Sequence, residues 1–238
     1  MVKTAVIMAA GMGTRFGKYT ESIPKGFIPF KGRAMVIRSI ETLIDCGIEK
    51  IIIGTGYKKE AYEALAEKYP QVVCCHSPRY AETNCLYTLW NCREMVGNDD
   101  ILMLDSDLVF EHRAVSELLA FEKDSAILTA PLTKFQDAYY VQEDENGRFT
   151  GWSKDRNAIT PCGELVGIHK LSNAFFREVC DYYTPIIEQQ PKLSYEPVFT
   201  EISLKRHPIY ICKVFPLDWY EIDDEADLRF AEENVPLD

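Results

Sequence analysis

The stretch TAVIMAAGMGTRFG, residues 4–17, decides the fold. A strand-like apolar run, residues 4–10, passes directly into three glycines, Gly11, Gly13 and Gly17, and a cation, Arg15, lies between them. Glycines after a buried strand let backbone N–H groups approach a phosphate chain, and a cation in the loop can neutralise it. The stretch therefore predicts a strand followed by a phosphate-binding loop. The alternative is that the glycines only make a tight turn from strand to helix.

Strand-like and helix-like segments alternate outward from this stretch. The expected strands are residues 4–10, 50–54, 72–75, 101–104 and 126–130, and the expected helices are 35–46, 60–68, 84–96 and 115–122. Continuous apolar strands separated by amphipathic helices indicate a mainly parallel α/β sheet that is covered on both faces. In such a sheet, ligands bind at the carboxyl ends of the strands.

The second half of the chain has a different pattern. Residues 139–143 and 148–153 flank an acidic turn whose Asn146-Gly147 pair favours a β-hairpin. The remaining expected elements are strands at 164–169 and 209–214 and helices at 174–188, at 197–205 and from 225 onward. Because no Pro/Gly/Ser-rich linker separates the halves, we expect one domain over residues 1–238.

Composition limits the classes of partner. The chain has 238 residues, 47% of them hydrophobic, and a formal net charge of -11. This charge works against a long contact with nucleic acid or an anionic membrane surface, so the expected partners are small molecules. No apolar stretch has the length of a signal or membrane segment, and the eight cysteines lack C-x-x-C spacing and are expected to be reduced, which together predict a cytoplasmic protein.

Two common phosphate-binding motifs do not fit the glycine loop. A P-loop needs Lys-Ser or Lys-Thr after its last glycine, but Tyr19 follows Gly17-Lys18. A dinucleotide fold needs a third glycine where Phe16 stands, and the strand at 51–54 does not end in the acidic residue that would bind a ribose.

Two carboxylates follow the expected strand at 101–104, in the motif Asp105-Ser106-Asp107. Mg²⁺ prefers one or two carboxylates together with waters and substrate phosphates, so this strand end is a candidate Mg²⁺ site. A solvated turn is the alternative interpretation.

The glycine loop followed by Pro24-Lys25 resembles the nucleotide-binding signature of the nucleoside-diphosphate-sugar pyrophosphorylase superfamily. The resemblance implies the nucleotide-diphospho-sugar transferase fold, a Rossmann-like, mainly parallel mixed sheet flanked by helices, with a β-rich acceptor-binding insertion. It further implies that Arg15 and Lys25 bear on the triphosphate and are catalytic, and that Gly11, Gly13 and Thr14 supply backbone and hydroxyl contacts.

The same resemblance implies the metal ligands. Asp107 and Asp223 would hold the Mg²⁺, although Asp223 stands just before the expected helix from 225 and could instead be its N-cap, with Asp224 as the ligand.

Two further segments, residues 80–89 and 220–223, look like those of the small cytidylyltransferases that activate phosphocholine or 2-aminoethylphosphonate. That group often carries paired asparagines where this chain has Asn84-Cys85. The likeness implies CTP as the donor, and a nucleotide site that includes Ala9, Ala10, Asn84 and Asp105. It also implies that Lys154 reaches the acceptor phosphate or phosphonate and that Glu196 meets the acceptor's ammonium group. Each of these last two could instead be a solvated surface residue.

The expected reaction is transfer of CMP to an amino-alkyl phosphonate or phosphate, with pyrophosphate leaving. Residues 1–131 would then form the nucleotide-binding half and residues 132–238 the acceptor-binding half with the second metal ligand. The overall likeness favours 2-aminoethylphosphonate as acceptor. Phosphocholine stays open as the acceptor. Its quaternary ammonium would need a box of aromatic side chains, and the chain has candidates in Tyr139, Tyr140, Trp152, Tyr195 and Trp219.

Other interpretations remain at this stage. They are a sugar-1-phosphate nucleotidyltransferase, which the short second half disfavours, and a nucleotide-binding module without turnover. A homo-oligomer and a fused downstream enzyme also stay open.

Overall fold

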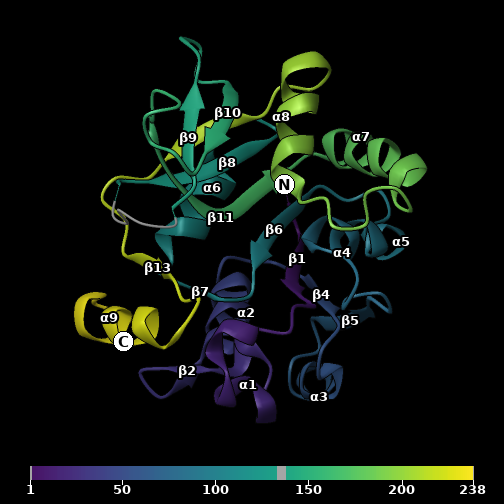
Figure 1. The fold of residues 1–238 in the computed structure, drawn as a ribbon, viewed down its shortest axis with the longest axis vertical. Coiled ribbons are helices and arrows are strands. Elements are labelled where there is room, and N and C mark those ends of the chain that lie inside the picture. Colours follow the sequence, from purple (N-terminus) through teal and green to yellow (C-terminus); the bar gives the residue numbers. More distant parts are fainter. Residues whose placement is uncertain (1, 133–137, 238) are drawn as a thin grey trace.

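The computed structural model of the protein describes residues 2–132 and 138–237, which are built around a mixed sheet (Figure 1). Its strands follow the order β10-β9-β11-β6-β1-β4-β5, and β8 joins β11 to β12. The bounds are β1 Thr4–Ala9, β4 Lys50–Thr55, β5 Val72–His76, β6 Ile101–Asp105, β8 Ala126–Ala130, β9 Tyr140–Glu143, β10 Phe149–Ser153, β11 Gly163–Leu171 and β12 Tyr210–Lys213.

The strands of the first half are parallel to one another. β1 pairs with β4 and β6, and β4 pairs with β5, whereas β11 runs antiparallel to β6. In this register Met8 lies between Gly54 and Asp105, so β1, β4 and β6 end at the same edge of the sheet. The predicted fold class, a mainly parallel mixed sheet flanked by helices, is confirmed.

Helices cover both faces of the sheet. Successive side chains of a strand point to opposite faces, and the apolar strands therefore make both faces apolar. Ala5, Ile7 and Ala9 of β1 belong to the apolar cluster of one face, and Val6 and Met8 to that of the other. The first cluster includes residues of α2 Met35–Asp45, α3 Lys59–Lys68 and α6 Arg113–Ala120, and the second includes residues of α4 Cys85–Asn91, α7 Asn173–Tyr183 and α8 Tyr195–Lys205. Within the described ranges, no helix combines the length and the apolar character needed to cross a bilayer.

The predicted hairpin is present as β9 and β10, and α8 packs against it. Its turn is held by the side chain of Asp144, whose Oδ1 accepts hydrogen bonds from the backbone N–H groups of Asn146 and Arg148, each at 2.9 Å. Figure 1 shows this pair of strands beside α8 in the upper part of the view, whereas α1 Lys18–Ser22 lies at the bottom.

Two predicted helices differ from the observed ones. The segment 84–96 forms two helices, α4 and α5 Arg93–Val96, which separate at Cys92. The predicted helix 174–188 ends at Tyr183 and is followed by a 3₁₀ turn, η3 Thr184–Ile186. Pro185 explains the second difference, because proline lacks the backbone N–H that would continue the α-helical hydrogen bonds beyond Tyr183.

Several short elements were not predicted. They are α1 Lys18–Ser22, the hairpin of β2 Pro29–Phe30 with β3 Arg33–Ala34, and the antiparallel pair of β7 Leu108–Phe110 with β13 Trp219–Glu221. Strands of two or three residues are too short for periodicity to reveal. The β7–β13 pair matters for the site, because it brings the segment before α9 Glu225–Asn234 alongside the end of β6.

Candidate active site

The loop after β1 is folded compactly against Lys25. Gly13 has a φ of 62°, in the left-handed region, and a Cβ there would lie 3.0 Å from the Cβ of Lys25. The Thr20 hydroxyl donates to the carbonyls of Gly13 and Gly17 at 3.1 and 3.2 Å, which closes the loop from within. Glycine is therefore needed at position 13 both for the backbone conformation and for the close approach of Lys25.

Two cations meet the carboxylates at the strand ends. Lys25 Nζ donates to Asp107 Oδ2 and, at 2.7 Å, to Asp223 Oδ1, which also accepts from Arg15 Nη2 at 2.7 Å. The Lys25 side chain is 12% exposed and that of Arg15 58%, so the lysine is fixed while the arginine reaches toward solvent. Burial alone lowers the pKa of Lys25, but the charges of Asp107 and Asp223 outweigh it and raise that pKa above its ordinary value.

Asp107, Glu221 and Asp223 form a cluster of carboxylates. One oxygen from each lies within 4.8 Å of the others. The β7–β13 pairing produces this proximity, since Glu221 is opposite Leu108 and the Ile222 N–H donates to the Asp107 carbonyl at 2.9 Å. Asp107 Oδ1 is buried and has no hydrogen-bond partner among the described residues. An all-oxygen donor set with an unpartnered buried carboxylate oxygen fits a hard divalent cation.

The neighbouring aspartates 223 and 224 have different roles. Asp224 is the N-cap of α9, because its Oδ1 accepts from the backbone N–H groups of Ala226 and Asp227 at 2.7 and 3.0 Å. Asp223 faces Lys25 and Arg15 instead. The N-cap alternative for Asp223 is therefore wrong, and Asp224 is occupied at the helix start.

Asp105 lies at the centre of the site. Tyr195 of α8 donates a hydrogen bond to Asp105 Oδ2 at 3.3 Å. Burial, and then the negative charges of Asp107, Glu221 and Glu196, raise the pKa of Asp105 well above that of an ordinary carboxyl group. A bound cation would relieve this repulsion.

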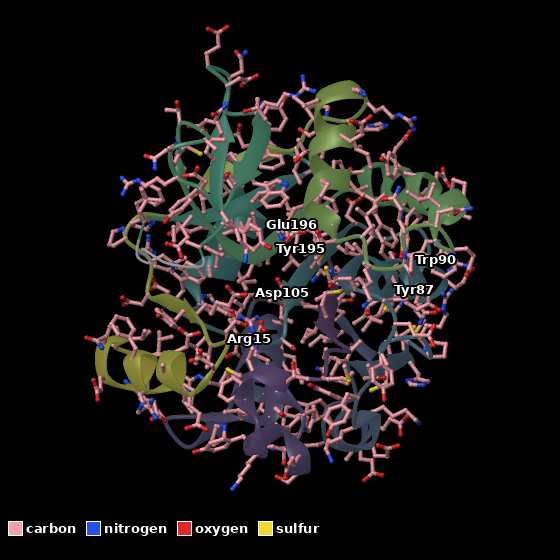
Figure 2. The ribbon with its side chains drawn as sticks, in the orientation of Figure 1. Arg15, Tyr87, Trp90, Asp105, Tyr195 and Glu196 are labelled. Atoms are coloured by element: carbon pink, nitrogen blue, oxygen red, sulfur yellow. The ribbon has the colours of Figure 1, made fainter. Side chains whose placement is uncertain are left out.

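Two cavities adjoin at these carboxylates. The first has a volume of about 350 Å³ and the second of about 220 Å³. Both are lined by Arg15, Cys85, Asp105, Asp107 and Asp223. Figure 2 shows Asp105 near the middle of the molecule, with Arg15 on the side of the N-terminal loop and Tyr195 and Glu196 on the side of α8. A group bound in one cavity would therefore meet a group bound in the other beside the carboxylates.

Most predicted nucleotide-site residues line the first cavity: Ala10, Gly11, Gly13, Thr14, Arg15, Lys25, Asn84 and Asp105. Ala9 does not line it. The alternation of β1 directs Ala9 into the apolar cluster with α2 and α3, and the cavity is instead lined by Met8 on the opposite face.

The predicted acceptor residues line the second cavity. Lys154 lies just after β10, with its Nζ 4.5 Å from the ring centroid of Tyr139, and Glu196 is buried near the start of α8. The solvated-residue alternative is therefore wrong for Glu196. Of the aromatic candidates, Tyr139 and Tyr195 line the second cavity, whereas Tyr140, Trp152 and Trp219 line neither cavity.

Sequence reasoning missed several lining residues. Glu221 is the most important, and its signal was the spacing of two from Asp223, which puts both side chains on the same side of an extended segment. Tyr80, Thr83 and Thr88 in the first cavity carried no separate signal, because they come from a loop and a helix that only the fold brings to the strand ends.

Comparisons with known proteins agree with this geometry. Residues 5–180 match the family described as MobA-like NTP transferase domain. The CMP-5'-(3-aminopropyl)phosphonate synthase of Streptomyces rubellomurinus is 26% identical over 242 residues, which cover 96% of this chain and 38% of that protein. The 2-aminoethylphosphonate cytidylyltransferase of Lancefieldella rimae is 34% identical over 105 residues, 44% of this chain and 43% of that protein. The matches thus span less than half the length of these two relatives.

Among solved structures, a CTP:phosphocholine cytidylyltransferase from Streptococcus pneumoniae superposes with a TM-score of 0.80 at 23% identity, covering 98% of this chain and 99% of that one. At this identity the superposition establishes the fold.

Proposed function

The chain belongs to the MobA-like NTP transferase domain family, and on that basis we propose that it is a CTP-dependent cytidylyltransferase that transfers CMP to a small amino-alkyl phosphonate or phosphate. The best candidate for the acceptor is 2-aminoethylphosphonate. The names of the two relatives, one a CMP-aminopropylphosphonate synthase and the other a 2-aminoethylphosphonate cytidylyltransferase, support this choice.

The observation that carries the proposal is the pair of cavities joined at Asp105, Asp107 and Asp223. A transfer between two polyanions requires two adjacent sites and positive charge between them. The first cavity, with the glycine loop, would take CTP, and the second would take the acceptor. Residues 1–131 supply most of the first lining, and residues 132–238 supply Lys154, Glu196 and Asp223.

In the proposed reaction, an acceptor oxyanion attacks the α-phosphorus of CTP in line. A bond forms between that oxygen and the phosphorus, the bond from the phosphorus to the oxygen bridging toward the β-phosphorus breaks, and pyrophosphate leaves with the electron pair. The nucleophile is already an anion, so no general base is needed. Arg15 and Lys25 would neutralise the triphosphate, and preorganised charges of this kind commonly contribute about 10²- to 10³-fold in rate.

The metal proposed for the site is Mg²⁺, held by Asp107 and Asp223, with Glu221 within reach. When bound, it would neutralise charge on the triphosphate. Lys25 neutralises the charges of Asp107 and Asp223 in this structure. When Mg²⁺ neutralises them instead, we expect the Lys25 ammonium to move toward the phosphates.

The lining of the second cavity favours an acceptor with a primary ammonium group over one with a quaternary ammonium group. Glu196 Oε2 is buried and lacks a hydrogen-bond partner among the described residues, so it needs a donor. A primary ammonium offers three N–H donors and a quaternary ammonium none. Tyr139 and Tyr195 are the aromatic residues that line this cavity within the described ranges, fewer than usually box a quaternary ammonium. Lys154, on the same lining, would bind the phosphonate.

The testing experiment is an acceptor screen at fixed CTP and Mg²⁺, with pyrophosphate release as the readout. We expect release with 2-aminoethylphosphonate, less with phosphocholine and none with glucose-1-phosphate. Turnover of glucose-1-phosphate alone would select a sugar nucleotidyltransferase instead. Tight CTP binding without release for any acceptor would mean a binding module.

A further inference from the structure

A histidine outside both cavities contacts the residue that binds Asp105. His169 lies on β11 and is fully buried beneath α8. Its ring packs edge-on against Tyr195, with ring centroids 5.3 Å apart, and against Phe199, at 5.7 Å. His169 lines neither the first nor the second cavity, so it has no direct access to a bound substrate.

A chain of hydrogen bonds connects this histidine to the site. His169 Nε2 lies 3.4 Å from the Tyr195 hydroxyl oxygen, and that hydroxyl donates to Asp105 Oδ2 at 3.3 Å. Burial raises the pKa of Tyr195, so its hydroxyl keeps its proton and stays a donor. Both distances are long for hydrogen bonds, so each bond is weak by itself.

The direction of these two hydrogen bonds fixes the tautomer of His169. Tyr195 gives its one proton to Asp105, so its oxygen must accept from His169, and acceptance requires a proton on Nε2. His169 Nδ1 is buried without a partner among the described residues. An unpaired buried N–H is rare and costly, which also favours the proton on Nε2. Burial lowers the pKa of His169 to about 3, so the ring is neutral.

We propose that His169 is a positioning residue, whose Nε2–H holds the Tyr195 hydroxyl and, through it, fixes Asp105 at the junction of the two cavities. This role of His169 rests on the proposed function and deepens it, because Asp105 lines both cavities. Removal of a histidine that only filled the core would act on stability alone.

The first arm of the test does not depend on turnover. Protein labelled with ¹⁵N-histidine is examined by NMR from about pH 5 to 8, the range in which an ordinary histidine titrates. The chain has four histidines, and the signals of His169 are identified by their absence from the spectrum of His169→Gln. We expect the His169 signals to report a neutral ring protonated at Nε2 throughout. A ring protonated at Nδ1, or a charged ring at pH 5 to 6, overturns the proposal.

The second arm measures kinetic coupling. His169→Leu and Tyr195→Phe are each expected to lower kcat about tenfold, with the KM for CTP nearly unchanged. The double variant should be no slower than Tyr195→Phe, because both substitutions remove the same contact to Asp105. Losses that multiply overturn the proposal. His169→Gln, which keeps a donor near the Nε2 position, should recover part of the rate.

The matched control is Phe199→Leu. It loosens the packing around the same ring but leaves both hydrogen bonds, so we expect a lower Tm and kcat within about twofold of wild type. An equal loss of kcat in this variant would mean that packing alone sets the rate, against the proposal. If the wild-type protein turns over no acceptor, the proposed function fails. The positioning is then decided by the NMR arm and by a crystal structure of His169→Leu, where the Asp105 carboxylate should have rotated away from its wild-type orientation.

Discussion

At the scale of single residues, Lys25 is the side chain whose charge the site depends on. It lies between Asp107 and Asp223 and is almost buried with them. Lys25→Met would leave two carboxylates facing each other, so we expect a loss of about 2–4 kcal/mol in the free energy of unfolding. Urea denaturation without Mg²⁺ measures this loss, and added Mg²⁺ should restore part of it. Turnover should fall by about 10²- to 10³-fold.

The control for that substitution is Lys18→Met, which removes an exposed lysine from α1, in the same region of the chain. Stability and turnover should stay close to those of wild type. If Lys25→Met behaved in the same way, the proposed part of Lys25 in holding the carboxylates and the triphosphate would be wrong.

Asp223 and Asp224 offer a comparison of two adjacent carboxylates. Asp223→Asn should abolish most of the Mg²⁺-dependent turnover while the protein stays folded, since it removes a proposed metal ligand. Asp224→Ala should cost about 1 kcal/mol of stability, because α9 loses its N-cap, with kcat almost unchanged. Steady-state assays over a Mg²⁺ series, with thermal melts of both variants, check this. The opposite pattern would reassign the ligand to Asp224.

At the scale of elements, β11 shapes the site through a shift in its pairing register with β8, between Leu165 and His169. Gly167 has a φ of 81°, and a Cβ there would lie 2.9 Å from Asp105 Oδ2. We expect Gly167→Ala to strain the backbone by about 1 kcal/mol or more and to displace Asp105, so that kcat falls more than stability explains. The comparison is Gly151→Ala on β10, where an added Cβ meets nothing within 4 Å. Equal kcat for the two variants would mean that Asp105 tolerates displacement.

The elements also show how far sequence reasoning reaches. The long apolar strands and amphipathic helices of the first half were predictable, because a period of two or of 3.6 persists over enough residues to be read. The β7–β13 pair was not predictable, since each strand has three residues and the pairing joins positions more than 100 residues apart. That pairing is what places Glu221 beside Asp107, so the third carboxylate of the cluster was missed.

The roles of site residues could be predicted only where the elements that carry them could be predicted. The glycine loop, Lys25 and Asp105-Ser106-Asp107 lie next to strand ends that periodicity locates, and most of these residues line the first cavity. Ala9 was assigned to the nucleotide site from resemblance, although strict alternation along β1 directs it to the core. The buried state of Glu196 depends on how α8 packs against the β9–β10 hairpin, which no local pattern encodes.

At the scale of the whole molecule, His169 couples global stability to pH. Its pKa is lowered to about 3 by burial, against an ordinary value of about 6.5. Between these values the unfolded chain binds a proton that the folded protein does not, so this contribution to stability is complete above pH 6.5 and is lost as pH falls toward 3. The slope approaches about 1.4 kcal/mol per pH unit within that window. Urea midpoints of wild type and His169→Gln at pH 4.5 to 7.5 measure it, and parallel curves would contradict it.

The central claim is that CTP and an amino-alkyl phosphonate react across Asp105, Asp107 and Asp223, where the two cavities meet. The most direct measurement is ³¹P NMR of the protein mixed with CTP, Mg²⁺ and 2-aminoethylphosphonate. We predict that pyrophosphate and a CMP-phosphonate product, with coupled phosphate and phosphonate signals, appear in equal amounts, and that Asp107→Asn suppresses both. Unchanged CTP, or CTP hydrolysed to CMP without a phosphonate product, would contradict the claim.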